Sequence, residues 1–64
     1  MDLYELHYDV PTPIVVLVGD SRHAMWPRTS TGRRIYRPLM VDGDTLLALR
    51  ASAAGQYLLE ARAC

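Results

Sequence analysis

The chain has 64 residues, half of them apolar, and its seven arginines balance its seven acidic side chains. This length fits one domain, residues 1–64, and the apolar content excludes an intrinsically disordered chain. The longest apolar run is too short to span a membrane, and Cys64, the single cysteine, excludes an internal disulfide and a cysteine zinc cluster.

Two strands are predicted at the start of the chain. Residues 3–10 alternate between an apolar face and a polar face with Glu5, His7 and Asp9, which is typical of a half-buried strand. Two prolines then end this strand, because proline lacks the donor that a sheet ladder needs. Residues 14–18 are apolar throughout and mostly β-branched, which predicts a central strand buried on both faces.

The middle of the chain predicts a long loop and an edge strand. Segment 21–32 shows no period and contains proline, serine, threonine and glycine, so we expect a long, partly ordered loop of functional importance. Residues 33–41 follow as a strand. Pro38 interrupts it, which favours a place at a sheet edge or at a bulge.

The C-terminal part predicts a hairpin and a third strand. Asp42-Gly43 between two apolar runs is a strong signal for a two-residue hairpin turn. The turn would lead into a strand at 45–51, and a second turn at 52–55 into a strand at 56–62. With 33–41 these strands form a three-strand meander.

A helix is the alternative for this region. Asp44 or Thr45 could cap it, and the apolar residues have helical spacing, at Leu46, Leu49, Ala53, Tyr57 and Ala61. Gly55 inside such a helix would cost about 1 kcal/mol, so the meander is favoured. The predicted fold is therefore mainly β, a small five-stranded antiparallel meander or SH3-like barrel, with a short C-terminal helix as the α+β alternative.

Charge is distributed unevenly. Residues 21–41 carry five arginines and no acidic residue, whereas residues 1–20 carry four acidic residues and no basic one. Arginine pairs with carboxylates or phosphates, and tryptophan, tyrosine and arginine dominate protein-binding hot spots. The predicted partner-binding residues are Arg22, His23, Trp26, Arg28, Arg33, Arg34, Tyr36 and Arg37.

These residues predict a non-enzymatic protein-binding module, an inhibitor or accessory subunit of a larger complex. A small β-domain that binds nucleic acid through the same basic segment is one alternative. A solvated loop whose arginines pair with the acidic N-terminal strand, while Trp26 fills the core, is another. We further expect a cytoplasmic protein, with no signal peptide because the start is acidic, and a homodimer could form through the edge strand 33–41.

Catalytic and metal sites are not predicted. Asp20, Ser21 and His23 lie close in sequence, but a turn explains them, and closeness along a loop does not supply the geometry of a nucleophilic serine. His7, His23 and Cys64 lack the spacing of metal ligands. We expect no enzyme activity and no cofactor.

Two short segments resemble known families. Residues 16–27, read from Val16 to Trp26-Pro27, are similar with a one-residue gap to the opening motif of MbtH-like proteins, which bind and activate adenylation domains of peptide synthetases. That resemblance implies partner contacts by His23, Trp26 and Pro27, although the later tryptophans of the family are missing here. Residues 31–39 are similar to a strand of the longer CcdB-like gyrase toxins, and the following residues differ. We assign the chain to neither family.

Overall fold

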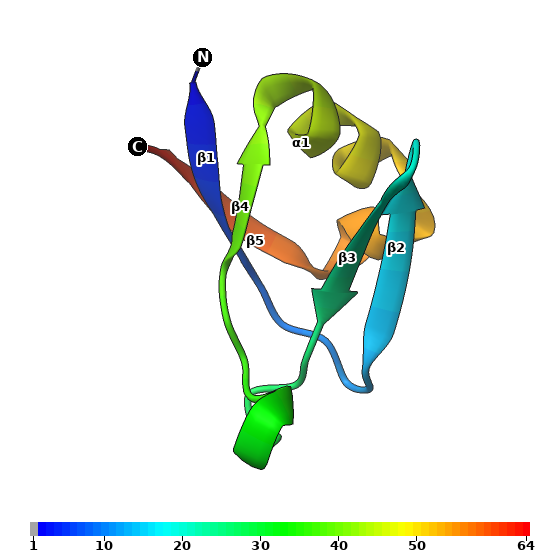
Figure 1. Ribbon diagram of the computed structural model, residues 1–64, viewed down its shortest axis with the longest axis vertical. Coiled ribbons are helices and arrows are strands. Elements are labelled where there is room, and N and C mark those ends of the chain that lie inside the picture. The colour runs from blue at the N-terminus through cyan, green and yellow to red at the C-terminus, as the bar shows by residue number, and fades with distance from the viewer. Residues whose placement is uncertain (1) are drawn as a thin grey trace.

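The computed structural model describes residues 2–64, and it is mainly β, as the sequence predicts. Five strands form two antiparallel sheets, and the described residues contain one α-helix (Figure 1). The barrel is not closed, since the sheets have three and two strands. The elements in chain order are β1 (Leu3–Tyr8), β2 (Ile14–Val18), β3 (Ser21–Met25), the 3₁₀ turn η1 (Gly32–Arg34), β4 (Leu39–Asp42), α1 (Gly43–Ala51), the 3₁₀ turn η2 (Ala53–Tyr57) and β5 (Leu58–Ala63).

The three-stranded sheet has the order β4-β1-β5, with β1 in the middle and antiparallel to both neighbours. The predicted alternation along this strand is confirmed. Leu6 and Tyr8 are buried, whereas Glu5 and His7 on the other face are half-buried. The inner face of the sheet therefore carries the core, and its outer face carries Glu5 and His7 beside the exposed Leu3 and Met40.

The second sheet is the β2–β3 hairpin. Val18 pairs with Ser21, which leaves a two-residue turn at Gly19-Asp20. Gly19 has a φ of +58°, which glycine adopts without strain. The prediction of a continuous loop at 21–32 is wrong at its start, because Ser21–Met25 is a strand.

The prediction that residues 14–18 form a central strand is also wrong. β2 pairs with β3 alone, so it is the outer strand of a two-stranded sheet. Its alternate residues face the core half-buried, but Val15 is 58% exposed and Leu17 is 68% exposed. The apolar run reflects one buried face and one outward apolar face.

The hairpin predicted at Asp42-Gly43 is wrong, because these residues begin α1. The Asp42 carboxylate accepts a hydrogen bond of 2.8 Å from the Thr45 backbone N–H, which caps the helix. Leu46 and Leu49 then lie on the buried side of α1 and pack on the inner face of the sheet. The strand predicted at 45–51 is therefore helical. The helix alternative expected Asp44 or Thr45 as the cap, but the cap is Asp42.

The remaining C-terminal elements partly follow the prediction. Ser52 ends α1, and its hydroxyl accepts a hydrogen bond from the Ala54 N–H, which opens η2. The last strand, predicted at 56–62, is β5. It pairs with β1 rather than with the preceding segment, so the meander is wrong.

The predicted strand 33–41 is shorter than expected. Only Leu39–Asp42 forms β4, directly after Pro38 and at an outer position of the sheet. Arg33 and Arg34 belong instead to the 3₁₀ turn η1.

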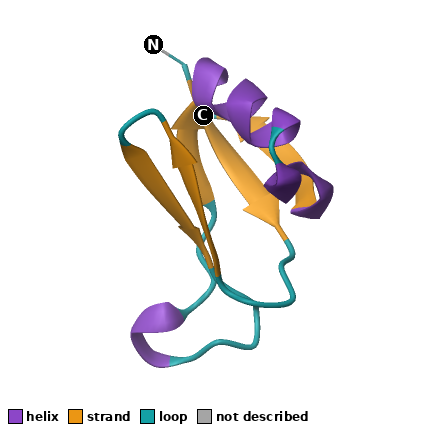
Figure 2. Cartoon of the chain, turned by 90° about the vertical axis from the view of Figure 1, so that its right-hand side faces the viewer, coloured by secondary structure: helices purple, strands orange, loops and turns teal. Residues whose placement is uncertain are grey.

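Two buried clusters hold the layers together. Leu6, Val41, Leu46 and Leu49 join the sheet to α1, with Val16 and Val18 of the hairpin packed against them. The second cluster joins β1, the hairpin and η2 through Tyr8, Val10, Met25 and Ala54. In the side view of Figure 2, the loop with η1 stands apart from the strands and α1.

Candidate partner-binding loop

The connection from β3 to β4, residues 26–38, forms a loop at one end of the molecule and is called the basic loop here (Figure 1). It carries most of the predicted partner-binding residues, namely Trp26, Arg28, Arg33, Arg34, Tyr36 and Arg37. Arg22 lies at the other end of β3, beside the Gly19-Asp20 turn, so the structure does not bring it to this loop.

Tyr8 holds both ends of the basic loop. Its side chain is 0% exposed. Its hydroxyl donates a hydrogen bond of 2.7 Å to the Arg37 carbonyl oxygen and accepts one of 3.3 Å from the Trp26 backbone N–H. A buried residue of the central strand therefore fixes where the loop begins and ends.

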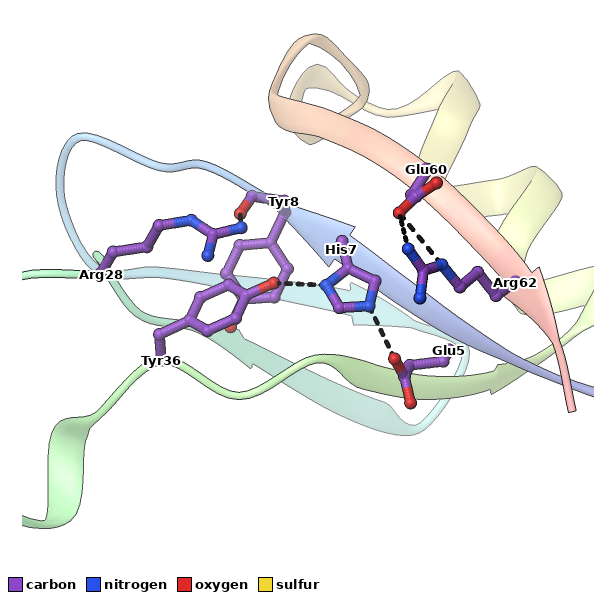
Figure 3. A network of polar contacts seen from close by, with 7 residues as sticks. All are labelled: Glu5, His7, Tyr8, Arg28, Tyr36, Glu60 and Arg62. Carbon is purple, nitrogen blue, oxygen red and sulfur yellow. Dashed lines mark hydrogen bonds and ion pairs between the residues drawn. The ribbon is translucent and has the colours of Figure 1, made fainter.

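Arg28 and Tyr36 pack together inside the loop (Figure 3). The Arg28 guanidinium carbon lies 4.1 Å from the centroid of the Tyr36 ring, a cation–π distance. The same guanidinium donates a hydrogen bond of 3.4 Å to the Tyr8 carbonyl oxygen. The centroid of the Tyr36 ring also lies 4.8 Å from that of the Tyr8 ring. Arg28 therefore contacts both tyrosines and helps to hold the loop on β1.

A polar chain links Tyr36 to the outer face of β1 (Figure 3). His7 Nε2 lies 2.7 Å from Glu5 Oε1, and His7 Nδ1 lies 3.1 Å from the Tyr36 hydroxyl. An ionised carboxylate only accepts, so Nε2 donates, and Nδ1 of the neutral ring then accepts from the hydroxyl. Glu5 and His7 are not among the predicted site residues, although the predicted alternation places both on one face.

Within the described residues 2–64, the exposed arginines of the loop have no carboxylate partner. Among residues 2–64, Glu60 forms an ion pair with Arg62, and Glu5 is hydrogen-bonded to His7. The alternative that the loop arginines pair with the acidic N-terminal strand is therefore wrong. Arg33 and Arg34 are exposed on η1, and the Arg34 guanidinium carbon lies 5.8 Å from the Trp26 ring centroid.

His23 lies away from this exposed surface. It sits on the inner face of the hairpin opposite Val16, and its Nε2 is buried without a hydrogen-bond partner. Among residues 2–64, no group of three or more histidine, cysteine, aspartate or glutamate side chains could hold a metal ion. In the same part of the chain, every helix is too short or too polar to cross a membrane.

Comparisons of the chain with protein-family models, with curated proteins and with solved structures find no match. The local resemblance to MbtH-like proteins implies partner contacts by His23, Trp26 and Pro27. In the structure Pro27 is buried and His23 points inward, so only Trp26 of these three is positioned near the exposed arginines.

Proposed function

We propose that the chain is a non-enzymatic protein-binding module, an inhibitor or accessory subunit of a larger complex, that binds an acidic surface of its partner through the basic loop. The observation that carries this proposal is that the exposed arginines of the loop have no carboxylate partner among residues 2–64, with Arg33, Arg34 and Arg37 lying outside the contact of Arg28 with Tyr36. Their loop is fixed at both ends by one buried hydroxyl.

The free guanidinium groups favour binding of carboxylates, and the fixed loop favours binding in general. A guanidinium is planar and binds a carboxylate through two parallel hydrogen bonds, and a partner's acidic side chains supply such groups. A loop that is already held in place loses less conformational entropy when it binds. Arginine and tryptophan side by side, as Arg34 and Trp26 are, also suit a protein-binding hot spot.

Nucleic acid is the second candidate, since phosphates also bind arginine. Two observations weaken it. A base-stacking site needs open aromatic faces, but Arg28 lies over the Tyr36 ring and Tyr8 packs beside it, which leaves Trp26 as the aromatic ring of the loop that could stack on a base. The chain is also neutral overall, whereas nucleic-acid-binding domains are usually basic.

The test captures partners on the immobilised protein from a lysate of the source cells, with and without nuclease. The variant Arg33→Ser/Arg34→Ser removes two exposed loop charges. The matched control, Arg50→Ser/Arg62→Ser, removes two exposed arginines elsewhere. We expect one stoichiometric protein that survives nuclease, binds the control and is lost with the loop variant.

Two results would contradict this function. Equal capture by both variants would show that the loop arginines are not the binding surface. Loss of all captured protein after nuclease treatment would replace a protein partner by nucleic acid, and that binding should fall steeply with salt.

A further inference from the structure

The free edge of β2 has an unusual composition for an outer strand. Natural edge strands carry charged residues, proline or bulges that prevent pairing with another chain. β2 reads Ile-Val-Val-Leu-Val and has none of these within its five residues. Its partner strand β3 covers one edge, and no strand of residues 2–64 pairs with the other.

The hairpin register shows which backbone groups face this free edge. In an antiparallel pair, residues that exchange both hydrogen bonds alternate with residues that exchange none. The pair flanking a two-residue turn, here Val18 and Ser21, is hydrogen-bonded, and so are the pairs of Val16 and Ile14. The N–H and C=O groups of Val15 and Leu17 therefore point away from β3.

The side chains of the same two residues are exposed as well. Val15 is 58% and Leu17 68% exposed, on the outward face of the hairpin. Beside the free edge lies an open groove of about 540 Å³ between β2 and the segment 52–57, and no charged residue lines it. An extended strand without charges could lie along this edge.

A second copy of β2 is such a strand, since its five residues are extended and uncharged. Two-fold symmetry then fixes the register. Val15 and Leu17 are equally distant from Val16, so a two-fold axis at Val16 places Val15 of one copy opposite Leu17 of the other. Each such pair would exchange two backbone hydrogen bonds and bring two exposed aliphatic side chains together. Pro13 and Gly19 are also equidistant from Val16, and the missing N–H of Pro13 would end the ladder.

We propose that this protein self-associates as a two-fold dimer, in which β2 pairs antiparallel with β2 of a second copy about Val16. The product is a four-stranded sheet in the order β3-β2-β2-β3. The dimer uses no residue of the basic loop, so it is independent of the proposed function. It also replaces the edge strand expected at 33–41, of which only the short β4 is formed.

Sedimentation equilibrium over a range of protein concentrations measures the association. Because an interface of this kind is small, we expect a reversible dimer whose population rises with concentration. Amide hydrogen exchange locates the interface. The N–H groups of Val15 and Leu17 should be protected only at high concentration, whereas those of Val16 and Val18 should be protected at all concentrations.

A charge-swap series tests the register. The variant Val15→Lys/Leu17→Lys places like charges opposite each other across the axis, which should raise the dissociation constant at least about tenfold. Mixing it with Val15→Glu/Leu17→Glu should restore a mixed dimer. Leu47→Lys/Leu59→Lys is the control, since these leucines are exposed to similar extents, 64% and 63%, on other elements.

Each outcome decides the proposal. A concentration-dependent dimer that the lysine variant disrupts, that the mixture restores and that the control leaves unchanged supports it. A monomer up to about 1 mM overturns it, because no affinity of useful size then remains. A dimer that persists in the lysine variant, or that leaves the Val15 and Leu17 amides unprotected, also overturns it, since another surface must then associate.

Discussion

The Tyr8 hydroxyl donates a hydrogen bond of 2.7 Å to the backbone carbonyl oxygen of Arg37, 29 residues further along the chain. The same hydroxyl accepts from the Trp26 N–H. One buried side chain of β1 therefore satisfies a backbone group at each end of the basic loop. The position of the exposed arginines depends on the packing of the central strand.

Removal of this hydroxyl should destabilise the fold and loosen the loop. Tyr8→Phe keeps the ring but leaves the Trp26 N–H and the Arg37 carbonyl without their partner, and an unsatisfied buried group costs about 1–3 kcal/mol. Urea denaturation measures the free energy of unfolding, and amide exchange at Trp26 reports on the loop. Tyr4→Phe is the control, because Tyr4 packs against the other buried cluster. Equal losses in the two variants would contradict the role of the Tyr8 hydroxyl.

The sequence predicts those elements whose own side chains determine them. β1 follows from its alternation, and the concentration of arginines in the basic loop follows from the sequence, in which residues 21–41 carry five arginines and no acidic residue. β3 was missed because its sequence, Ser-Arg-His-Ala-Met, has no apolar period, and it is a strand because it pairs with β2. The link from His7 to Tyr36 joins residues 29 positions apart, so only the tertiary fold reveals it.

The Asp42-Gly43 pair shows why a strong local signal can fail. Aspartate followed by glycine is compatible with a hairpin turn and with the start of a helix, because aspartate also caps helices. Leu46 and Leu49 favour the helix, because a helix places both side chains on the inner face of the sheet. Burial against residues distant in sequence therefore overrides the local preference.

Replacement of two glycines of this region by alanine should change the free energy of unfolding in opposite directions. A Cβ on Gly55 would overlap the Arg50 carbonyl oxygen and lie 3.1 Å from its carbonyl carbon. Gly55→Ala should therefore lower the free energy of unfolding by about 1–3 kcal/mol. At Gly43 the nearest atom to a Cβ is Tyr4 Cε2 at 3.8 Å, an ordinary contact, so Gly43→Ala should stabilise by about 0.4–1 kcal/mol. Chemical denaturation of both variants checks the pair, and a Gly55→Ala protein as stable as wild type would contradict the close packing.

The helix cap predicts an acid-dependent loss of stability. Hydrogen bonds from Thr45, first its backbone N–H and then its side chain, hold the pKa of Asp42 below its usual value. A carboxyl group whose pKa is lower in the folded state stabilises the fold above its unfolded pKa of about 3.9, and this contribution is lost as the pH falls through the folded pKa.

Asp42→Asn isolates this effect, because asparagine caps helices about as well but does not titrate. The two proteins should have similar unfolding midpoints at neutral pH. Below about pH 4 the wild type should lose stability faster than the variant. Thermal unfolding followed by circular dichroism between neutral pH and pH 2 measures the difference. Parallel curves over the whole range would show that the Asp42 carboxylate does not contribute in this way.

The arginines of the basic loop should separate into two classes. Both Arg28 and Arg33 are exposed, and neither has a carboxylate partner among residues 2–64. Arg28 lies over the Tyr36 ring and donates to the Tyr8 carbonyl oxygen, whereas Arg33 lies on η1. Arg28→Ser should therefore lower the free energy of unfolding by about 0.5–1 kcal/mol. Arg33→Ser removes the same charge and should change it by less than about 0.5 kcal/mol.

The affinity for the partner should respond differently from the stability. Arg33→Ser should weaken binding of the captured partner while the unfolding curve stays that of wild type, because its guanidinium is free to meet the partner. Urea denaturation and a binding titration on the same samples separate the two effects. If Arg33→Ser destabilised the protein as much as Arg28→Ser, Arg33 would belong to the structure of the loop, and its loss of binding would say nothing about direct contact.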